Sequence, residues 1–227
     1  MLSVCLILSA SPVAAKEFWE KPFVNWKHEE VVKMLEDSPW SAKVILTEQR
    51  QGRETRNVGG EMEVYHTYTV RLFSALPVRQ AYVRMFQLMN KYDELSKEDK
   101  QAFDQKFAPA LRDFGDQVIV NLDFATNDRQ ASMEVDRQLK QMTADQLKQG
   151  AYLISDRLGR VALLNYFPPS PDGTGAKFVY PRTVDGKPLV APEDKELKFE
   201  LWVPGTWHKV YHVWKVKDLI LDGKVVY

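Results

Sequence analysis

Three of the four histidines fall in segments whose alternating pattern predicts β-strands. His66 lies on the apolar face of a strand predicted over residues 61–73, and His208 and His212 share one face of a strand predicted over residues 208–221. Imidazole can bind a metal ion or act as a general base, so His66 with either of the other two is a candidate for one of these roles. His208 and His212 cannot share an ion by themselves, because positions i and i+4 of a strand are roughly 13 Å apart. The other interpretation is that each histidine is a partly buried, hydrogen-bonded residue of its strand.

The signatures of familiar active sites are absent from the sequence. His28-Glu29 begins like a zinc-protease motif, but Val32 occupies the position that needs the second histidine. Residues 173–177 lack the first glycine and the Ser/Thr of a phosphate-binding loop, and they precede a predicted strand instead of a helix. There is no Gly-x-Ser-x-Gly elbow, and the single cysteine is Cys5. We therefore assign no catalytic residue and no cofactor, and we leave any metal site to the three histidines.

Charge patterning gives two further indications about partners. Arg50, Arg53 and Arg56 form a basic loop that could contact an acidic partner, although such a run is more often a solvated surface. The whole chain carries 31 basic and 31 acidic side chains. This neutral balance gives no electrostatic reason to expect nucleic acid or an anionic membrane as the partner.

The sequence has six tryptophans, a high number for 227 residues. Trp40 and Trp214 fall on predicted apolar faces, and we expect them in the core. Trp202 and Trp207 flank Pro204-Gly205 and are expected at the rim of a loop. An indole at such a rim combines a large apolar face with a polar edge, which suits contact with a sugar or another ligand.

The elements that must position these residues indicate an α+β fold with a mostly antiparallel sheet. Four helices are expected in the N-terminal and middle parts of the chain. Two span residues 27–37 and 77–91, and a third begins at Ser96 and has an apolar stripe that reaches Phe114. The fourth spans residues 130–148, with a restart at Thr143. Strands are expected over residues 42–49, 61–73, 117–124, 151–155, 160–167, 176–181, 197–203 and 208–221. The first two strands form a hairpin, and Asp222-Gly223 is a strong turn signal after the last.

The first fifteen residues have the composition of a signal peptide. An uncharged apolar run is followed by Val13-Ala14-Ala15, the small residues that a signal peptidase recognises. The run is too short to span a bilayer, which needs about 20 apolar residues. A positively charged segment does not precede it, so we expect the true start to lie upstream. The alternative is a hydrophobic N-terminus on a cytosolic protein. The domain prediction is a leader over residues 1–15 and a single α+β domain over residues 16–227.

Three segments resemble a group of exported bacterial proteins with no assigned function. They are Ser38-Pro39-Trp40 after a short helix, Pro77-Val78-Arg79-Gln80-Ala81-Tyr82-Val83-Arg84, and Phe178-Val179-Tyr180-Pro181-Arg182. The resemblance implies export and a single fold. It implies no chemistry and no site residues.

Together these observations predict an exported protein, periplasmic or secreted, that is soluble and has no transmembrane segment after removal of the leader. With no complete catalytic motif, the favoured function is a non-catalytic binding or interaction protein of the cell envelope, whose partner is another envelope protein or a small ligand. The alternative is an exported hydrolase or metal-dependent enzyme whose site is assembled from residues distant in sequence. A pocket with convergent polar groups would favour the enzyme, whereas an apolar patch or an exposed strand edge would favour an interaction protein.

Overall fold

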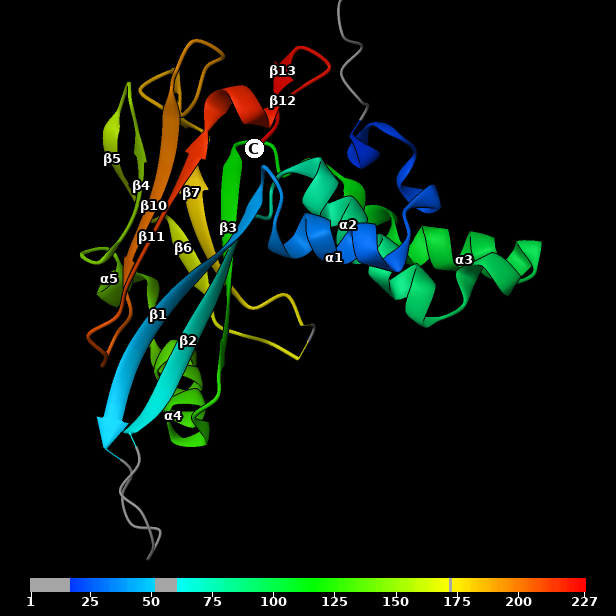
Figure 1. Ribbon diagram of the computed structural model, residues 1–227. Helices are drawn as coiled ribbons and strands as arrows, with labels where there is room; N and C mark the ends of the chain where they lie inside the picture. The colour runs from blue at the N-terminus through cyan, green and yellow to red at the C-terminus, as the bar shows by residue number, and fades with distance from the viewer. Residues whose placement is uncertain (1–16, 52–60, 172) are drawn as a thin grey trace, which may run out of the picture.

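The structure, a computed structural model, describes residues 17–51, 61–171 and 173–227. The predicted leader and residues 52–60, with Arg53 and Arg56 of the predicted basic loop, lie outside the described residues. Arg50, predicted in the same loop, belongs instead to the strand β1 (Ser41–Gln51), where it pairs with Met62. Helices and antiparallel sheets together confirm the α+β class (Figure 1). Figure 1 shows α1, α2 and α3 gathered on one side of the sheets, while α4 lies near the far end of the β1–β2 hairpin.

The α-helices begin and end at positions that local chemistry explains. In α1 the carboxylate of Glu30 accepts a hydrogen bond from the backbone N–H of Lys27 (2.8 Å), and the helix begins at His28, within one residue of the predicted start. Thr143 caps a separate helix, as its sequence predicts. The α-helices are α1 (His28–Glu36), α2 (Leu76–Met89), α3 (Lys97–Phe107), α4 (Arg129–Gln141) and α5 (Ala144–Leu147). The 3₁₀ helices are η1 (Phe18–Glu20), η2 (Phe23–Asn25), η3 (Tyr92–Glu94), η4 (Ala108–Leu111) and η5 (Val216–Leu219).

The helix that opens after Ser96 is shorter than its apolar stripe suggested. It ends at Phe107, and Ala108–Leu111 continue as the 3₁₀ helix η4 with Pro109 in its first turn. Proline lacks the N–H that an α-helix needs and its ring clashes with the preceding turn. Phe114 therefore lies outside any helix.

Two antiparallel sheets form the body of the protein. One has five strands in the order β1-β2-β3-β7-β6, and the other has four in the order β11-β10-β4-β5. β1 lies beside β11 and β5 beside β7, so the sheets meet on both sides and enclose a core. Their strands are β1 (Ser41–Gln51), β2 (Glu61–Leu72), β3 (Gln117–Thr126), β4 (Ala151–Ser155), β5 (Gly159–Ala162), β6 (Asn165–Phe167), β7 (Ala176–Pro181), β10 (Glu196–Trp202) and β11 (Lys209–Lys215). Two small hairpins pair β8 (Thr183–Val184) with β9 (Lys187–Pro188) and β12 (Ile220–Leu221) with β13 (Lys224–Val225).

Two predicted strands are interrupted. The strand predicted over residues 160–167 is divided between β5 in one sheet and β6 in the other. Where the chain passes between the sheets, Leu163 is buried and the N–H of Leu164 donates to the carbonyl of Val179. The predicted strand 208–221 becomes β11, η5 and β12. The turn at Asp222-Gly223 is confirmed, and both residues have the positive φ that this hairpin type requires.

Side chains from the two sheets meet in the core. Phe178 of β7 and Phe199 of β10 contact edge to face, with ring centroids 5.5 Å apart. Trp40 and Trp214 are both buried, as predicted, and the indole N–H of Trp40 donates to the carbonyl of Val226 (2.8 Å). Among the described helices, none is long and apolar enough to cross a membrane.

Candidate functional site

The fold brings His66 and His208 into contact although 141 other positions separate them in the chain. His66 lies on the inner face of β2, and His208 immediately precedes β11. Because β11 lies beside β1, which pairs with β2, the ring centroids of the two histidines are only 4.3 Å apart. Both side chains are almost fully buried, at 1% and 3% exposure. One of the two His66 pairings considered from the sequence is thus present.

Tyr68 fixes the His208 ring. Its hydroxyl oxygen lies 2.6 Å from Nδ1 of His208, in a buried hydrogen bond between β2 and the segment before β11. Burial raises the pKa of Tyr68 well above its ordinary value, so the hydroxyl keeps its proton. When Tyr68 donates that proton to Nδ1, the neutral imidazole carries its own proton on Nε2.

His66 differs from His208 because both of its ring nitrogens are buried and have no hydrogen-bond partner among the described residues. The nearest carboxylate is that of Glu48 on β1, with 3.7 Å between Oε1 and Nε2 of His66. That separation is too long for a hydrogen bond. A buried polar group without a partner costs about 1–3 kcal/mol, so His66 destabilises the free protein unless something else meets its nitrogens.

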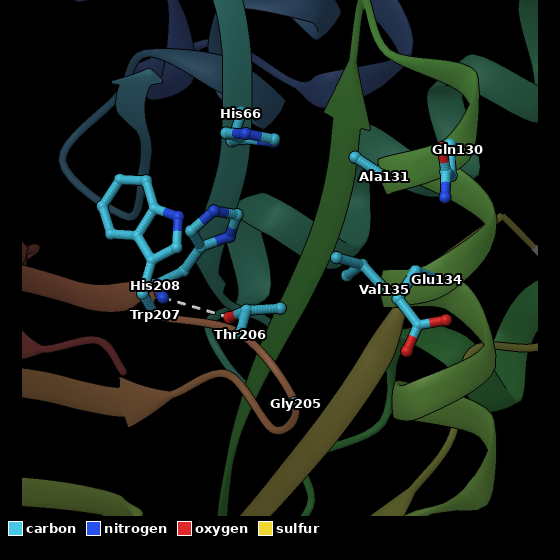
Figure 2. A pocket seen from close by; sticks show the side chains of 9 residues that line it. All are labelled: His66, Gln130, Ala131, Glu134, Val135, Gly205, Thr206, Trp207 and His208. Atoms are coloured by element: carbon cyan, nitrogen blue, oxygen red, sulfur yellow. Dashed lines mark hydrogen bonds between the residues drawn. The ribbon is translucent and has the colours of Figure 1, made fainter. Parts of the chain in front are cut away.

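A pocket of about 260 Å³ opens beside the histidine pair (Figure 2). Figure 2 shows the hairpin loop Gly205–His208 on one side of it and α4 on the other, with His66 reaching in from β2. The α4 side is formed by Gln130, Ala131, Glu134 and Val135.

Local geometry fixes the two walls. The carboxylate of Asp128 caps α4 by accepting hydrogen bonds from the N–H groups of Gln130 and Ala131 (2.8 and 3.0 Å). Gly205 has a φ of +71° and lies so close to α4 that an added Cβ would stand 2.8 Å from the Gln138 side chain. The loop thus lies against the Gln138 side chain of α4, and its positive φ at this position favours glycine.

Glu134 is the acidic group in the α4 wall. Its carboxylate accepts hydrogen bonds from Arg137 (2.6 Å) and Gln138 (2.7 Å). These bonds, that from Arg137 above all, hold the pKa of Glu134 below its ordinary value. The group is thus a carboxylate at neutral pH and is poorly suited to act as a general acid.

Trp207 forms the rim of the pocket, as the sequence suggested. It is 57% exposed, and its indole N–H donates to Oε2 of Glu48 (3.1 Å). Its ring stands nearly perpendicular to that of His208, with centroids 4.6 Å apart. These two contacts hold an exposed aromatic side chain in one orientation at the mouth of the site. Trp202 is also exposed, at 52%, but the ammonium group of Lys209 lies 5.3 Å from its ring centroid.

The third candidate histidine lies elsewhere. His212 sits on β11 opposite Phe199, packs against Trp214 with ring centroids 4.8 Å apart, and does not line the pocket. Burial lowers its pKa from 6.5 to about 4, so it is neutral at physiological pH. In the part of the chain that the structure describes, no group of three or more His, Cys, Asp or Glu side chains could hold a metal ion. His66 and His208 thus form a pair without His212.

Several site residues had no signal in the sequence. Tyr68 and Glu48 belong to strands whose pattern shows only which side faces the core. Gln130 and Glu134 occur on a helix with many other polar residues. The exposed indole of Trp207 was the one feature of the pocket wall, besides the histidines, that residue type and position made visible.

A second, apolar hollow of about 600 Å³ lies next to the edge strand β6. Its walls are mainly aromatic and aliphatic side chains, among them Phe73, Phe114, Ile119 and Phe167. Phe167 is 49% exposed. The protein therefore has both features that were expected to separate an enzyme from an interaction protein, a polar pocket and an apolar surface.

Comparison with known proteins finds no matching family model, no matching curated protein and no matching solved structure.

Proposed function

We propose that this chain is an exported, non-catalytic binding protein of the cell envelope that holds a small ligand in the pocket beside His66. The observation that supports the proposal is the buried imidazole of His66, whose two nitrogens have no hydrogen-bond partner among the residues that the structure describes. Such a group is costly in a free protein and becomes favourable when a ligand supplies the missing hydrogen bonds. A residue that weakens the fold and faces a pocket is typical of a binding site.

The lining favours binding over catalysis. The Thr206 hydroxyl donates to the carbonyl of Val203 (2.9 Å) and accepts from the N–H of His208 (3.0 Å), so it is not free to attack a substrate. No other Ser, Thr or Cys lines the described pocket. Glu134, with its lowered pKa, is not available as a proton donor at neutral pH.

NMR titration of protein labelled with ¹⁵N in its histidine side chains tests the proposal. The probes are small neutral amides, polyols, saccharides and carboxylates, added one class at a time. We expect at least one class to shift the ring signals of His66 and His208 and to leave those of His28 and His212 unchanged. The His66→Leu variant should not respond. The proposed binding site is wrong if no class of probe shifts the ring signals of His66. It is also wrong if the probe shifts the signals of the other histidines in His66→Leu as it does in wild type.

An exported hydrolase is the second candidate, and the Tyr68–His208 hydrogen bond favours it. A hydroxyl that orients an imidazole beside a pocket is an arrangement that a general base can use. Chromogenic esters and glycosides, assayed with wild-type protein and His208→Gln, separate the two candidates. Binding without turnover supports the binding protein, whereas turnover that His208→Gln abolishes would replace it by the hydrolase.

The export part of the proposal is supported by the apolar run and the small residues at 13–15. N-terminal analysis of the cellular product tests it. A chain that begins at Lys16 supports export, and an intact leader in the cytosol contradicts it.

A further inference from the structure

We propose that the ligand of the His66 pocket is a neutral saccharide unit, an inference that rests on the proposed binding function and specifies its ligand. The charge of the lining disfavours an anionic ligand. No lysine or arginine lines the described pocket, so it offers no cationic side chain to pair with a phosphate or carboxylate. A cationic ligand is also disfavoured, because Glu134 already has Arg137 as its partner at 2.6 Å.

The hydrogen-bonding groups of the pocket match hydroxyl groups. The ring nitrogens of His66 and the side-chain amide of Gln130 can take part in hydrogen bonds with a ligand, the amide both as donor and as acceptor. A hydroxyl is a donor and an acceptor as well, so a ligand with several hydroxyls can meet mixed groups of this kind without carrying a charge. The two nitrogens of His66 point in widely different directions, so one hydroxyl of a sugar ring can bond to one of them.

The apolar parts of the lining match the C–H faces of a sugar ring. Ala131 and Val135 lie on the α4 side, and the exposed indole of Trp207 lies at the rim. Trp207 is already held by Glu48 and His208, so little side-chain freedom is lost when a ring packs against it. An indole offers a broad apolar surface and keeps its polar edge bonded, as such a contact requires.

The size of the pocket limits the ligand to about one ring. Its volume of about 260 Å³ lies below the range of about 300–1,000 Å³ typical of sites for drug-sized ligands. A longer glycan would place one unit inside, and its neighbours would run out across Trp207.

Isothermal titration calorimetry of the full-length protein tests this inference. The probes are N-acetylglucosamine, glucose, galactose, mannose and the β-1,4 disaccharide of N-acetylglucosamine, with acetamide and ethylene glycol as neutral controls that have no ring. We expect saturable binding of at least one saccharide and none of the controls. Trp207→Ala and His66→Leu should each weaken it by about tenfold or more. The matched variant Trp202→Ala, which removes an exposed indole outside the pocket, should leave the affinity within about twofold.

The outcomes distinguish a failure of the saccharide inference from a failure of the proposed binding function. If the NMR titration shows that other neutral probes shift His66 but no saccharide binds, the saccharide inference is wrong and the binding function stands. If no probe of any class shifts His66, both fail. If a saccharide binds with equal affinity to wild type, Trp207→Ala and His66→Leu, its site lies elsewhere and the inference is overturned. Thermal unfolding of each variant verifies that Trp207→Ala and His66→Leu are folded.

Discussion

Replacing His66 by leucine removes two buried nitrogens that have no partner in the described protein. Their burial costs about 1–3 kcal/mol, and a leucine of similar size avoids that cost. The change also alters packing against His208 and Phe124, whose rings lie 4.3 and 6.0 Å away, and a volume-conserving exchange costs up to about 1.5 kcal/mol. We therefore expect His66→Leu to be as stable as wild type or more stable by up to about 2 kcal/mol. Ligand binding is lost in the same variant.

The matched control is Tyr68→Phe on the same strand. It removes one atom, the hydroxyl that bonds to Nδ1 of His208 at 2.6 Å, and leaves that nitrogen buried without this partner. We expect a loss of about 1–3 kcal/mol. Urea unfolding at pH 7 measures both free energies of unfolding, provided that the slope with denaturant is unchanged. A His66→Leu variant that is less stable by more than about 1 kcal/mol would refute the reasoning, since His66 would then contribute stabilising contacts to the free protein.

Three further predictions concern residues around the site and in the core. The folded-state pKa of His212 is about 4 against an ordinary value of 6.5, so the unfolded chain takes up the proton first as the pH falls. Stability is therefore full above about pH 6.5 and falls by about 3 kcal/mol toward pH 4. Urea unfolding across this pH range should show that the free energy of unfolding falls less steeply with pH in His212→Leu than in wild type. In the control His28→Gln, which changes an exposed histidine, the fall should equal that of wild type. Gly205→Ala should lower the free energy of unfolding by about 1–2 kcal/mol, because the added Cβ meets Gln138 at a positive φ. It should also weaken ligand binding, and equal affinity in a calorimetric titration would show that the loop does not need to pack on α4. Elemental analysis of protein purified without chelator should give no ion at one per chain, because His66 and His208 lack a third ligand of the usual kind among the described residues. A stoichiometric ion would contradict this.

The local elements could largely be predicted from the sequence because their causes are local. The alternation of β2 placed Val64, His66 and Tyr68 on one face, and all three are buried. The predictions failed where proline or a neighbouring element decides the structure. Pro109 ends α3 early, and the backbone near Leu163 leaves one sheet for the other because β7 offers a pairing partner there.

The site was less predictable because it depends on which strands are neighbours. The sequence offered His66 with His208 or with His212, and only the proximity of β11 to β1 selects His208. The contribution of α4 depends on how that helix packs against the loop at Gly205, which no local pattern encodes. The exposure of Trp207 was predictable, because a tryptophan beside Pro204-Gly205 lies on a turn.

A crystal structure of the protein soaked with the saccharide that binds in the calorimetric titration tests the central claim most directly. The account predicts ligand density between α4 and Gly205–His208, with a ligand oxygen within about 2.7–3.2 Å of a ring nitrogen of His66. Density for the sugar at another place, or a pocket in which the protein's own groups satisfy both nitrogens of His66, would contradict it.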